Sequence, residues 1–384
     1  MYLISSRFIR RYSKPRYYCK RDLLISWLIV IIFLLTISFN LEKSYSFIQK
    51  HHSSFYSLYS TPIAKRTLII VRTSHHCESR LKYLLTSWIS RYKDKQNQQN
   101  IFLLTDHYIK NSSYDKFANV ILTNCPQTHN KFDLCCKTAN EFEFYYNVTK
   151  DNNQFDWMCR FDDDQYLNLD NLYSYLGELD SSIPYYIGRT STHPLGIHGL
   201  KQKFRFATYG GGVCYSKVLL KKLRLYINKS ITPNECVKTG LSDDAYMGYT
   251  IEHKLNVSLT VLNDRLHSHL EHLDISFRRL TLQNLLQAIT FGFAWDRYQL
   301  SWMPIIHEII QLAKQNLNNE HSLMLLWNFL RDYEKLHPEN LTEKFDDSCT
   351  SYHKRVKAAK TPSKTQQLTT RITPVEKITV KKIV

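Results

Sequence analysis

Three adjacent carboxylates are the strongest chemical signal in the sequence. Asp162, Asp163 and Asp164, the acidic trio, follow residues 157–161, five residues of strand-like character. Like charges in a row repel, so they require a cation or helix N-terminal amides nearby. Ligands of open α/β sheets gather beyond the carboxyl ends of the strands, where these oxygens would suit Mg²⁺ or Mn²⁺ holding a diphosphate. The alternative is an acidic start to the next helix, facing water.

Two more groups of polar residues follow along the chain. Asp243 and Asp244, the acidic pair, precede a helix expected over residues 246–254, where they could serve only as an N-terminal cap. His267 and His269 are one residue apart, so in an extended segment both imidazoles lie on one side and can offer nitrogen to a divalent metal. A polar surface patch is the alternative for the histidines.

A run of glycines lies between the two acidic motifs. Gly210, Gly211 and Gly212 have apolar flanks, which indicates that the backbone approaches another group closely or adopts positive φ angles. A plain tight turn is the other explanation.

The segments that must position these residues alternate between strand and helix. Apolar runs predict buried strands at residues 67–71, 101–106, 120–123, 157–161 and 185–188. Helical periodicity predicts helices at residues 81–89, 137–146, 167–176 and 217–225, and a largely helical region at 280–335. The alternation indicates an α/β fold with a mostly parallel sheet and helices on both faces. The sequence contains no Gly-x-Gly-x-x-Gly and no P-loop motif, so it does not support a dinucleotide-binding fold or an NTPase.

The net charge of +17 is concentrated at the two ends of the chain. Residues 1–22 and 355–384 together supply 13 of the 17 charges, and the middle of the chain is only mildly basic. No nucleic-acid-binding motif accompanies the charge, which argues against a nucleic-acid partner. The composition of residues 355–384 predicts a disordered basic tail.

Residues 23–39 predict a membrane anchor. They are seventeen uncharged, mostly apolar residues behind a basic block, and residues 40–43 form a poor signal-peptide cleavage site. We expect a single-pass type II protein with residues 1–22 in the cytoplasm, a stem at 40–65 and a lumenal body. The short span suits the early secretory pathway, and a buried core helix is the alternative.

Cysteines and glycosylation sequences agree with a lumenal body. Eight of the nine cysteines follow the anchor, an even number that suits an oxidising compartment. Asn-x-Ser/Thr acceptors occur at Asn111, Asn147, Asn228, Asn256 and Asn340.

The order and spacing of the motifs resemble the Fringe branch of the β1,3-glycosyltransferases. The pattern is a strand that ends in the acidic trio, then FATxGGGxCxS at residues 206–216, then the acidic pair before a helix, then HSHLE at residues 267–271. The HSHLE string points to Fringe rather than to its galactosyl- and glucosyltransferase relatives. The resemblance implies a GT-A-like fold, with a catalytic domain at residues 66–302 and a helical extension at 303–354.

The resemblance also implies roles for individual residues. Asp164 and His269 would bind Mn²⁺, Asp244 would be the catalytic base, and Asp243 is the second candidate for that role. The positions that would bind the donor are Thr73, Arg80, Asp106, Asp162, Asp163, Gly210, Gly211 and Gly212.

The family pattern further implies the disulfides Cys125–Cys136 and Cys159–Cys214. The remaining Cys77, Cys135, Cys236 and Cys349 allow three pairings.

The chain departs from the Fringe pattern at three positions near the motifs. Tyr209 stands where the family has the first glycine of its run, Arg160 replaces a histidine, and Ala245 replaces a cysteine. We expect the bulk of Tyr209 to reshape the donor pocket.

The activity implied is a metal-dependent, inverting transfer of N-acetylglucosamine from UDP-N-acetylglucosamine. The acceptor would be O-linked fucose on EGF-like repeats of Notch-type receptors, joined in β1,3 linkage in the Golgi lumen. One alternative is a β1,3-transferase with a galactosyl or glucosyl donor and a different acceptor. Another is a catalytically silent lumenal lectin or folding partner, against which the intact acidic and histidine sets argue.

Overall fold

The computed structural model describes residues 62–89, 100–108, 110, 113–117, 119–128, 130–151, 154–197, 203–267, 282–293, 300–315, 321, 324 and 328. All of them belong to the unit Thr61–Val384, and Met1–Ser60 forms a separate unit outside the described residues. The predicted anchor and residues 40–61 of the predicted stem therefore lie outside the described part, as does the basic tail, whereas residues 62–65 of the predicted stem form helix α2 (Pro62–Lys65). No helix among the described residues has both the length and the apolar character that a membrane span requires.

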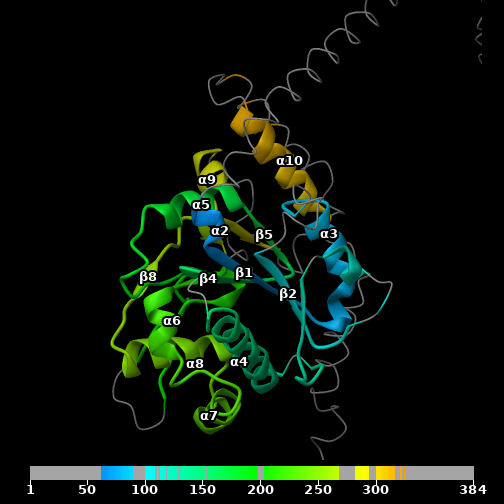
Figure 1. Cartoon of the computed structure of the whole chain (residues 1–384). Coiled ribbons are helices and arrows are strands. Elements are labelled where there is room, and N and C mark those ends of the chain that lie inside the picture. Colours follow the sequence, from blue (N-terminus) through cyan, green and yellow to red (C-terminus); the bar gives the residue numbers. More distant parts are fainter. Residues whose placement is uncertain are drawn as a thin grey trace, which may run out of the picture. The chain divides into compact units, whose positions relative to one another are not determined.

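A seven-stranded sheet forms the centre of the fold (Figure 1). Its strand order is β3-β2-β1-β4-β7-β6-β8. The central strand β1 is buried along its whole length because it is an apolar run, and it pairs in parallel with β2 and β4. The strands are β1 (Thr67–Arg72), β2 (Ile101–Thr105), β3 (Val120–Leu122), β4 (Trp157–Asp162), β6 (Tyr186–Gly188), β7 (Val213–Ser216) and β8 (Leu259–Val261).

One strand reverses direction. β7 follows the glycine run and lies antiparallel to both of its neighbours, β4 and β6. The sheet is therefore mostly parallel, as predicted, with β7 as the exception. The sequence analysis predicted no strand at residues 213–216, because the segment is short and its partners are distant in the chain.

A second, three-stranded sheet has the order β5-β10-β9. It consists of β5 (Gln165–Leu167), β10 (Thr290–Gly292) and β9 (Leu266–His267). β10 lies inside residues 280–335, so the prediction of a largely helical region is wrong there. Its three residues carry no period of their own and are held by pairing with β5 and β9. Helices α9 (Leu282–Gln287) and α10 (Trp302–Gln315) flank this strand in the chain.

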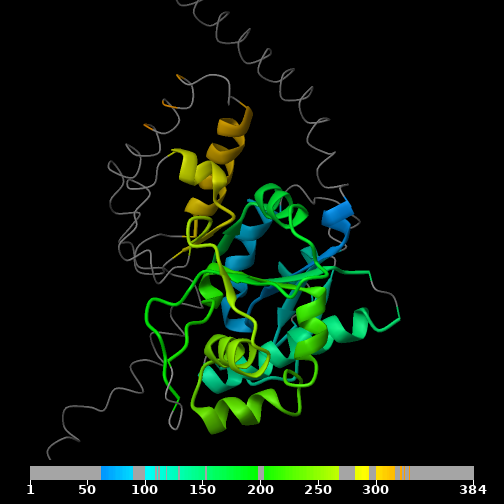
Figure 2. The same cartoon turned by 90° about the vertical axis from the view of Figure 1, so that its left-hand side faces the viewer.

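Helices cover both faces of the large sheet (Figures 1 and 2). On one face lie α4 (Lys131–Val148), α6 (Lys217–Leu223), α7 (Thr232–Thr239) and α8 (Asp243–Tyr249), which pack on the core side chains Leu68, Ile70 and Met158. On the other face lie α2 (Pro62–Lys65), α5 (Leu169–Gly177), α9 and α10. A 3-10 helix at His75–Arg80 leads from β1 into α3 (Leu81–Leu85).

Helix starts decide one of the alternatives left by the sequence. Helix α5 begins at Leu169, and the Asn168 side chain caps it by accepting a hydrogen bond from the Asn171 N–H. Strand β5 separates the acidic trio from this helix. The alternative that the trio caps the next helix is therefore wrong.

Three disulfides are formed between described cysteines. The structure contains Cys125–Cys136 and Cys159–Cys214, the two pairs that the resemblance implied. The third bond joins Cys135 of α4 to Cys236 of α7. Of the three pairings left open, only the one that joins Cys77 to Cys349 agrees with this bond. Cys77 is disulfide-bonded, and Cys349 lies outside the described residues.

Candidate active site

The acidic trio lies at the carboxyl end of β4, where β1 also ends. Asp162 is paired in register with Arg72, and the Asp163 N–H donates to the Arg72 carbonyl at 3.1 Å. The Asp163 carboxylate accepts hydrogen bonds from Thr73 Oγ1 at 2.6 Å and from Arg80 Nη1 at 3.0 Å. Thr73 and Arg80, both predicted to line the donor site, thus contact the trio directly.

Arg80 is shared between two carboxylates of the trio. The same Nη1 that contacts Asp163 also donates to Asp164 Oδ2 at 3.2 Å. Burial, with the neighbouring Asp164 charge, raises the pKa of Asp163 to about 6 despite the opposing effect of Arg80.

One oxygen of Asp164 is suited to a cation. Oδ1 is buried and accepts no hydrogen bond from any described residue, although Oδ2 is paired with Arg80. A buried carboxylate oxygen without a donor is unfavourable unless a cation compensates it, so the residue fits the predicted Mn²⁺ site. The described residues contain no group of three or more His, Cys, Asp or Glu side chains arranged to hold a metal ion. His269, the predicted imidazole ligand, lies outside them.

The strand that leads toward His269, β9, is among the described residues. Strand β9 places His267 level with Phe291, which is itself level with Tyr166 of β5. In this register, β9 runs from the level of Leu167 toward that of Tyr166, in the direction of the acidic trio. His267 itself is a core residue: its ring stacks on Phe291 at 5.4 Å, and burial lowers the pKa of its imidazole to about 4.

The glycine run packs against the trio at close range. Gly212 has φ +85°, and a Cβ there would lie 2.5 Å from the Phe161 ring, so both reasons for glycine apply at this position. Gln165 connects the loop to the trio: its Oε1 accepts from the Asp162 N–H at 2.9 Å, and its Nε2 donates to the carbonyls of Tyr209 and Gly210. Sequence reasoning assigned Gln165 no role; its only signal is its place directly after the trio.

The acidic pair opens helix α8, and its first member, Asp243, accepts two hydrogen bonds through one oxygen. Asp243 Oδ2 accepts from Arg72 Nη1 at 2.6 Å and from Thr138 Oγ1 at 2.9 Å. Burial opposes ionisation, but Arg72 and Arg160 outweigh it and lower the pKa of Asp243. Asp243 is therefore a buried, charged carboxylate, and the prediction that it is the second candidate base has no support from these contacts.

The second member has the properties of a general base. Asp244 is half-buried, and its Oδ1 accepts from Ser242 Oγ at 2.7 Å and from the Ala245 N–H at 2.8 Å. Among the described residues, no donor contacts its Oδ2. Burial, together with the charge of Asp243, raises the pKa of Asp244 to about 6. A carboxylate with that pKa can take a proton near neutral pH.

Arg72 connects the two acidic motifs. Its backbone is paired with Asp162, and its side chain reaches Asp243, 171 positions away in the chain. Its Nε also donates to Glu141 of α4 at 2.6 Å. Sequence reasoning gave Arg72 and Glu141 no role. The sequence signal that could have indicated a role for Arg72 is its charge at the end of an otherwise largely apolar strand.

Asp106, another predicted donor-site residue, lies at the carboxyl end of β2 next to β1. Its oxygens are already engaged, one by the His75 N–H at 2.9 Å and the other by Lys137 Nζ at 2.6 Å. These contacts make it a positioning residue for the His75–Arg80 helix, which carries Arg80.

The predicted glycosylation sites differ in exposure. Asn147 and Asn256 are exposed, at the end of α4 and in a turn with φ 53° respectively. Asn228 is half-buried, and its Oδ1 accepts from the N–H groups of Ser230 and Ile231. Asn111 and Asn340 lie outside the described residues.

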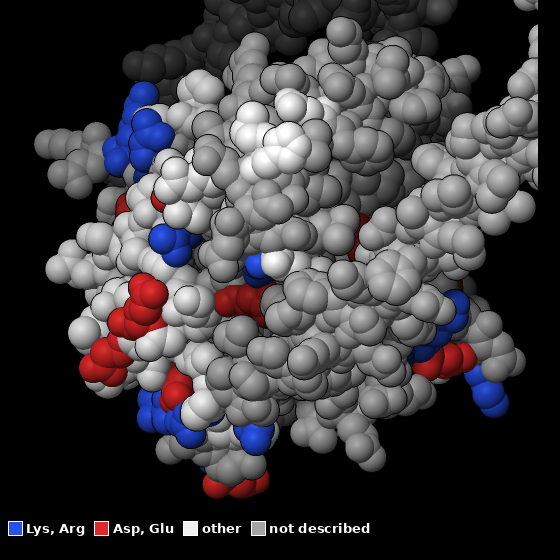
Figure 3. Space-filling model, turned by 90° about the horizontal axis from the view of Figure 1, so that it is seen from above, with Lys and Arg blue, Asp and Glu red and all other residues white. Residues whose placement is uncertain are grey.

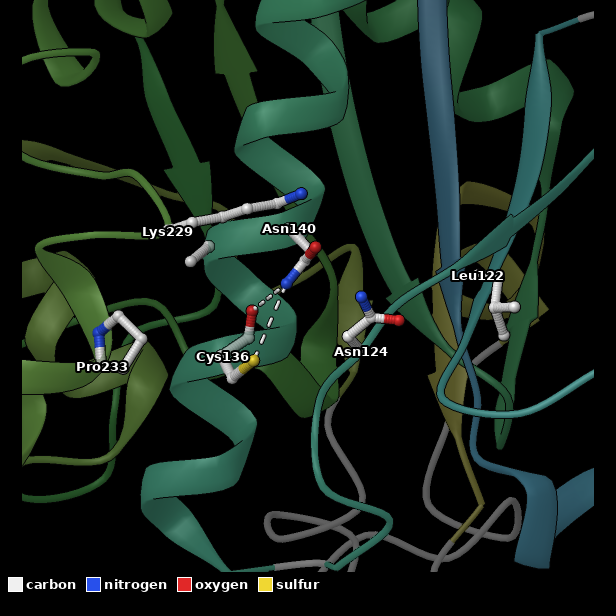
Figure 4. A pocket seen from close by; sticks show the side chains of 7 residues that line it. Leu122, Asn124, Cys136, Asn140, Lys229 and Pro233 are labelled. Atoms are coloured by element: carbon white, nitrogen blue, oxygen red, sulfur yellow. Dashed lines mark hydrogen bonds between the residues drawn. The ribbon is translucent and has the colours of Figure 1, made fainter.

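A separate pocket of about 230 Å³ lies between the end of β3, helix α4 and the segment before α7. Figure 4 shows Asn140 donating to the carbonyl and sulfur of Cys136 on its wall. None of its lining residues belongs to the acidic motifs: Leu122, Asn124, Cys136, Ala139, Asn140, Lys229 and Pro233.

The surface charge of the described residues is mixed on the face seen in Figure 3. Lys and Arg side chains alternate there with Asp and Glu in small groups rather than forming one continuous basic area.

Comparison with known proteins agrees with the resemblance inferred from the motifs. A Fringe-like family model matches residues 64–309, which is more than half of the chain. The chain belongs to the Fringe-like family. The match extends from the residues just before β1 into helix α10.

Curated relatives carry Fringe names. The chain is 33% identical over 237 residues to β1,3-N-acetylglucosaminyltransferase radical fringe of Xenopus laevis, covering 59% of this chain and 64% of the relative. It is 34% identical over 238 residues to the radical fringe of Notophthalmus viridescens, covering 59% and 55%. Against the Fringe glycosyltransferase of Drosophila melanogaster it is 33% identical over 237 residues, covering 59% and 54%. The matched region thus spans between half and two thirds of these relatives.

Among solved structures, one similar chain is a glycosyltransferase involved in the glycosylation of the major capsid of PBCV-1. It covers 63% of this chain and 99% of its own length at 12% identity, with a TM-score of 0.34, which is too low to carry an argument.

Proposed function

We propose that this protein is a metal-dependent, inverting β1,3-N-acetylglucosaminyltransferase. The observation that carries the proposal is the placement of two acidic motifs at one end of the sheet, bridged by Arg72. One motif offers a buried oxygen suited to a cation, and the other a carboxylate whose pKa is about 6. Family membership and the names of the relatives support the same reaction.

The acidic trio would hold Mn²⁺ and the donor diphosphate. Asp164 would ligate the ion through Oδ1, with His269 as the imidazole ligand and Asp162 and Asp163 beside them. When bound, Mn²⁺ supplies a Lewis acid that neutralises the UDP leaving group. Arg80, held at 3.0 Å by Asp163, adds a positive charge to the same place.

Asp244 would take the proton from the acceptor hydroxyl. As the hydroxyl oxygen attacks the anomeric carbon from the face opposite UDP, its proton passes to Asp244 Oδ2, the oxygen without a donor. Ser242 and Ala245 hold the other oxygen and so fix the direction of the carboxylate. One base is sufficient because inversion requires no covalent sugar–enzyme intermediate.

We further propose UDP-N-acetylglucosamine as the donor and O-linked fucose on EGF-like repeats of Notch-type receptors as the acceptor. Type II topology in the Golgi membrane would place the site in the lumen with these substrates. The support is the motif pattern, together with the names of the relatives.

The test is a mass measurement on a defined acceptor. The lumenal part of the chain is incubated with Mn²⁺, a fucosylated EGF repeat, and UDP-N-acetylglucosamine, UDP-galactose or UDP-glucose in turn. The proposal predicts the mass gain of one N-acetylhexosamine with the first donor only. Transfer from another donor would change the donor assignment, and no transfer from any of them would contradict the proposed function. The unfucosylated repeat is the matched control.

A further inference from the structure

A buried ion network lies beneath the proposed active site. Arg160, in the middle of β4, is 0% exposed, and its Nη2 contacts Asp162 Oδ1 at 2.6 Å. Its Nε lies 3.6 Å from Glu141 Oε2, and the other oxygen of Glu141 binds Arg72. Since Arg72 binds Asp243, two arginines flank one glutamate and each contacts a different acidic motif.

Arg160 has fewer hydrogen bonds than a buried guanidinium normally requires. Within the part of the chain that the structure describes, its Nε and Nη1 have no hydrogen-bond acceptor. Instead, its guanidinium carbon lies 4.0 Å from the centroid of the Tyr209 ring, and that of Arg72 lies 5.6 Å from the same ring. A cation over the face of a desolvated aromatic ring is stabilised by the negative face of the ring, so the ring compensates for the missing acceptors.

The Tyr209 ring is fixed from two directions. Its hydroxyl accepts a hydrogen bond from the Tyr215 hydroxyl at 3.2 Å, and its carbonyl accepts one from Gln165. Burial raises the pKa of the Tyr209 phenol well above its ordinary value, so the ring stays neutral beside the arginines. Tyr209 is therefore a core side chain, and the expectation that its bulk reshapes the donor pocket stays a prediction.

Resting on the proposed function, we propose that Arg160 and Tyr209 form one positioning unit of the active site. The ring holds the Arg160 guanidinium in the orientation that fixes Asp162 at the donor side and supports Asp243 at the acceptor side. These are two of the positions at which the chain departs from the Fringe pattern, and the structure places them in contact. The two departures are thus a single feature of this chain.

The unit also acts on the base. The groups that influence the Asp244 carboxylate are Asp243, the Ser242 hydroxyl, the Ala245 N–H and Arg160, and the Tyr186 phenol senses its charge. Arg160 favours the charged forms of both members of the acidic pair. If its charge is removed, the proton on Asp244 is lost only at a higher pH, so the acid limb of the rate profile moves upward by roughly half a unit to one unit.

Four variants test the unit through kinetics: Tyr209→Phe, Tyr209→Leu, Arg160→Met and the double variant Tyr209→Leu/Arg160→Met. Tyr209→Phe keeps the ring and is the matched control; we expect its kcat and pH profile to stay close to wild type. Tyr209→Leu keeps apolar volume without a π face and should lower kcat by roughly 10- to 100-fold, with a smaller change in KM. Arg160→Met should lower kcat similarly and raise the acid limb.

Non-additivity decides between one unit and two separate residues. We expect the double variant to be at most slightly slower than Arg160→Met alone, because the Arg72 guanidinium that remains beside the ring is farther from it, at 5.6 Å. Additive losses, or Tyr209→Leu behaving like Tyr209→Phe, would overturn the proposal. If Arg160→Met fails to fold, the comparison of Tyr209→Leu with Tyr209→Phe still decides.

Thermal unfolding of the same four variants requires no turnover. Tyr209→Phe should lower Tm by a few degrees, because the buried Tyr215 hydroxyl loses its acceptor, and Tyr209→Leu, which loses the ring as well, should lower Tm by roughly 5 °C more, with less-than-additive losses in the double variant. Equal Tm values for Tyr209→Leu and Tyr209→Phe would count against the contact even if transfer is observed. Conversely, absence of transfer in wild type would contradict the proposed function while leaving this measurement valid.

Discussion

The acidic trio and the acidic pair share one internal plan. In each motif, a buried arginine and a threonine hydroxyl hold one carboxylate, and the adjacent carboxylate keeps an oxygen without a donor. In the trio these are Asp163 and Asp164, and in the pair they are Asp243 and Asp244.

The motifs differ in how the arginine is shared. Arg80 lies 3.0 and 3.2 Å from both carboxylates that it serves in the trio. Arg72 contacts Asp243 at 2.6 Å and also forms an ion pair with Glu141. Among the described residues, no cation contacts Asp244. Because Arg80 is shared by two carboxylates, the trio is a partly neutralised anionic site, which suits a metal ion. Asp244 lacks such an arginine contact among the described residues, so its carboxylate can bind a proton near neutral pH. The same residue types would thus serve metal binding in the trio and proton transfer in the pair, according to which carboxylates the arginine contacts.

The largest effect should come from Asp244→Asn. Asparagine keeps the shape but cannot accept the proton, so we expect kcat to fall by roughly 1,000-fold. Affinity for UDP in the presence of Mn²⁺, measured by calorimetry, should change by less than about twofold, because Asp244 lies outside the trio. Wild-type turnover in this variant would remove Asp244 from the mechanism and with it the contrast between the motifs.

The corresponding change in the trio, Asp164→Asn, should act on binding instead. We expect Mn²⁺-dependent UDP affinity to fall by roughly 100-fold, since the oxygen suited to the cation loses its charge. Calorimetry with Mn²⁺ and with EDTA separates metal-dependent from metal-independent binding. If wild type binds UDP equally well under both conditions, the metal role of the trio is wrong.

The pH dependence should respond to a change at the pair. Asp163 of the trio and Asp244 of the pair both have a pKa of about 6, so a variant at Ser242 is needed to assign the profile to Asp244. Because the charged form of Asp244 is the proposed base and its pKa is about 6, kcat/KM should be level above pH 7 and fall about tenfold per unit below pH 6. Ser242→Ala removes a donor that favours the charged form, so this limb should move upward by roughly half a unit. An unmoved limb in Ser242→Ala would show that another group controls the profile.

The smallest effects are on stability. Thr73→Val and Thr138→Val each leave a buried carboxylate short of one donor, so each should lower the free energy of unfolding by about 1–2 kcal/mol. Thr86→Val is the control: its exposed hydroxyl bonds to a helix carbonyl, and the loss should stay within about 0.5 kcal/mol. Denaturant unfolding measures all three. A loss in the control as large as in the two site variants would mean that the hydroxyls contribute nothing specific to the carboxylates.

Local sequence patterns were sufficient for the main elements and for the location of the motifs. Buried strands β1 and β2 are largely apolar runs, β4 has strand-like character interrupted by Arg160, and helix α4 covers and extends the segment predicted from its periodicity. These signals suffice because burial of a whole strand or of one helix face is recorded within a few consecutive residues. The position of the acidic trio at the carboxyl end of β4 follows directly from them.

Short strands could not be predicted in this way. β5, β9 and β10 have two or three residues each, so no period can develop, and only pairing with one another stabilises them. The antiparallel direction of β7 depends likewise on two partner strands, both of which precede it in the chain by more than 25 residues, as its pairs Cys159↔Cys214 and Ile187↔Cys214 show.

The sequence by itself determined which residues are the candidates for chemistry: a run of three carboxylates, a second acidic step and a glycine segment that must pack tightly. Only the tertiary structure decided what each carboxylate does. The protonation and pairing of a carboxylate depend on the charges within a few ångströms of it, and those charges come from Arg72, Glu141 and Arg160, which are distant from the acidic pair in the chain. The local sequence around a carboxylate does not show which of these distant residues come close to it in the folded chain.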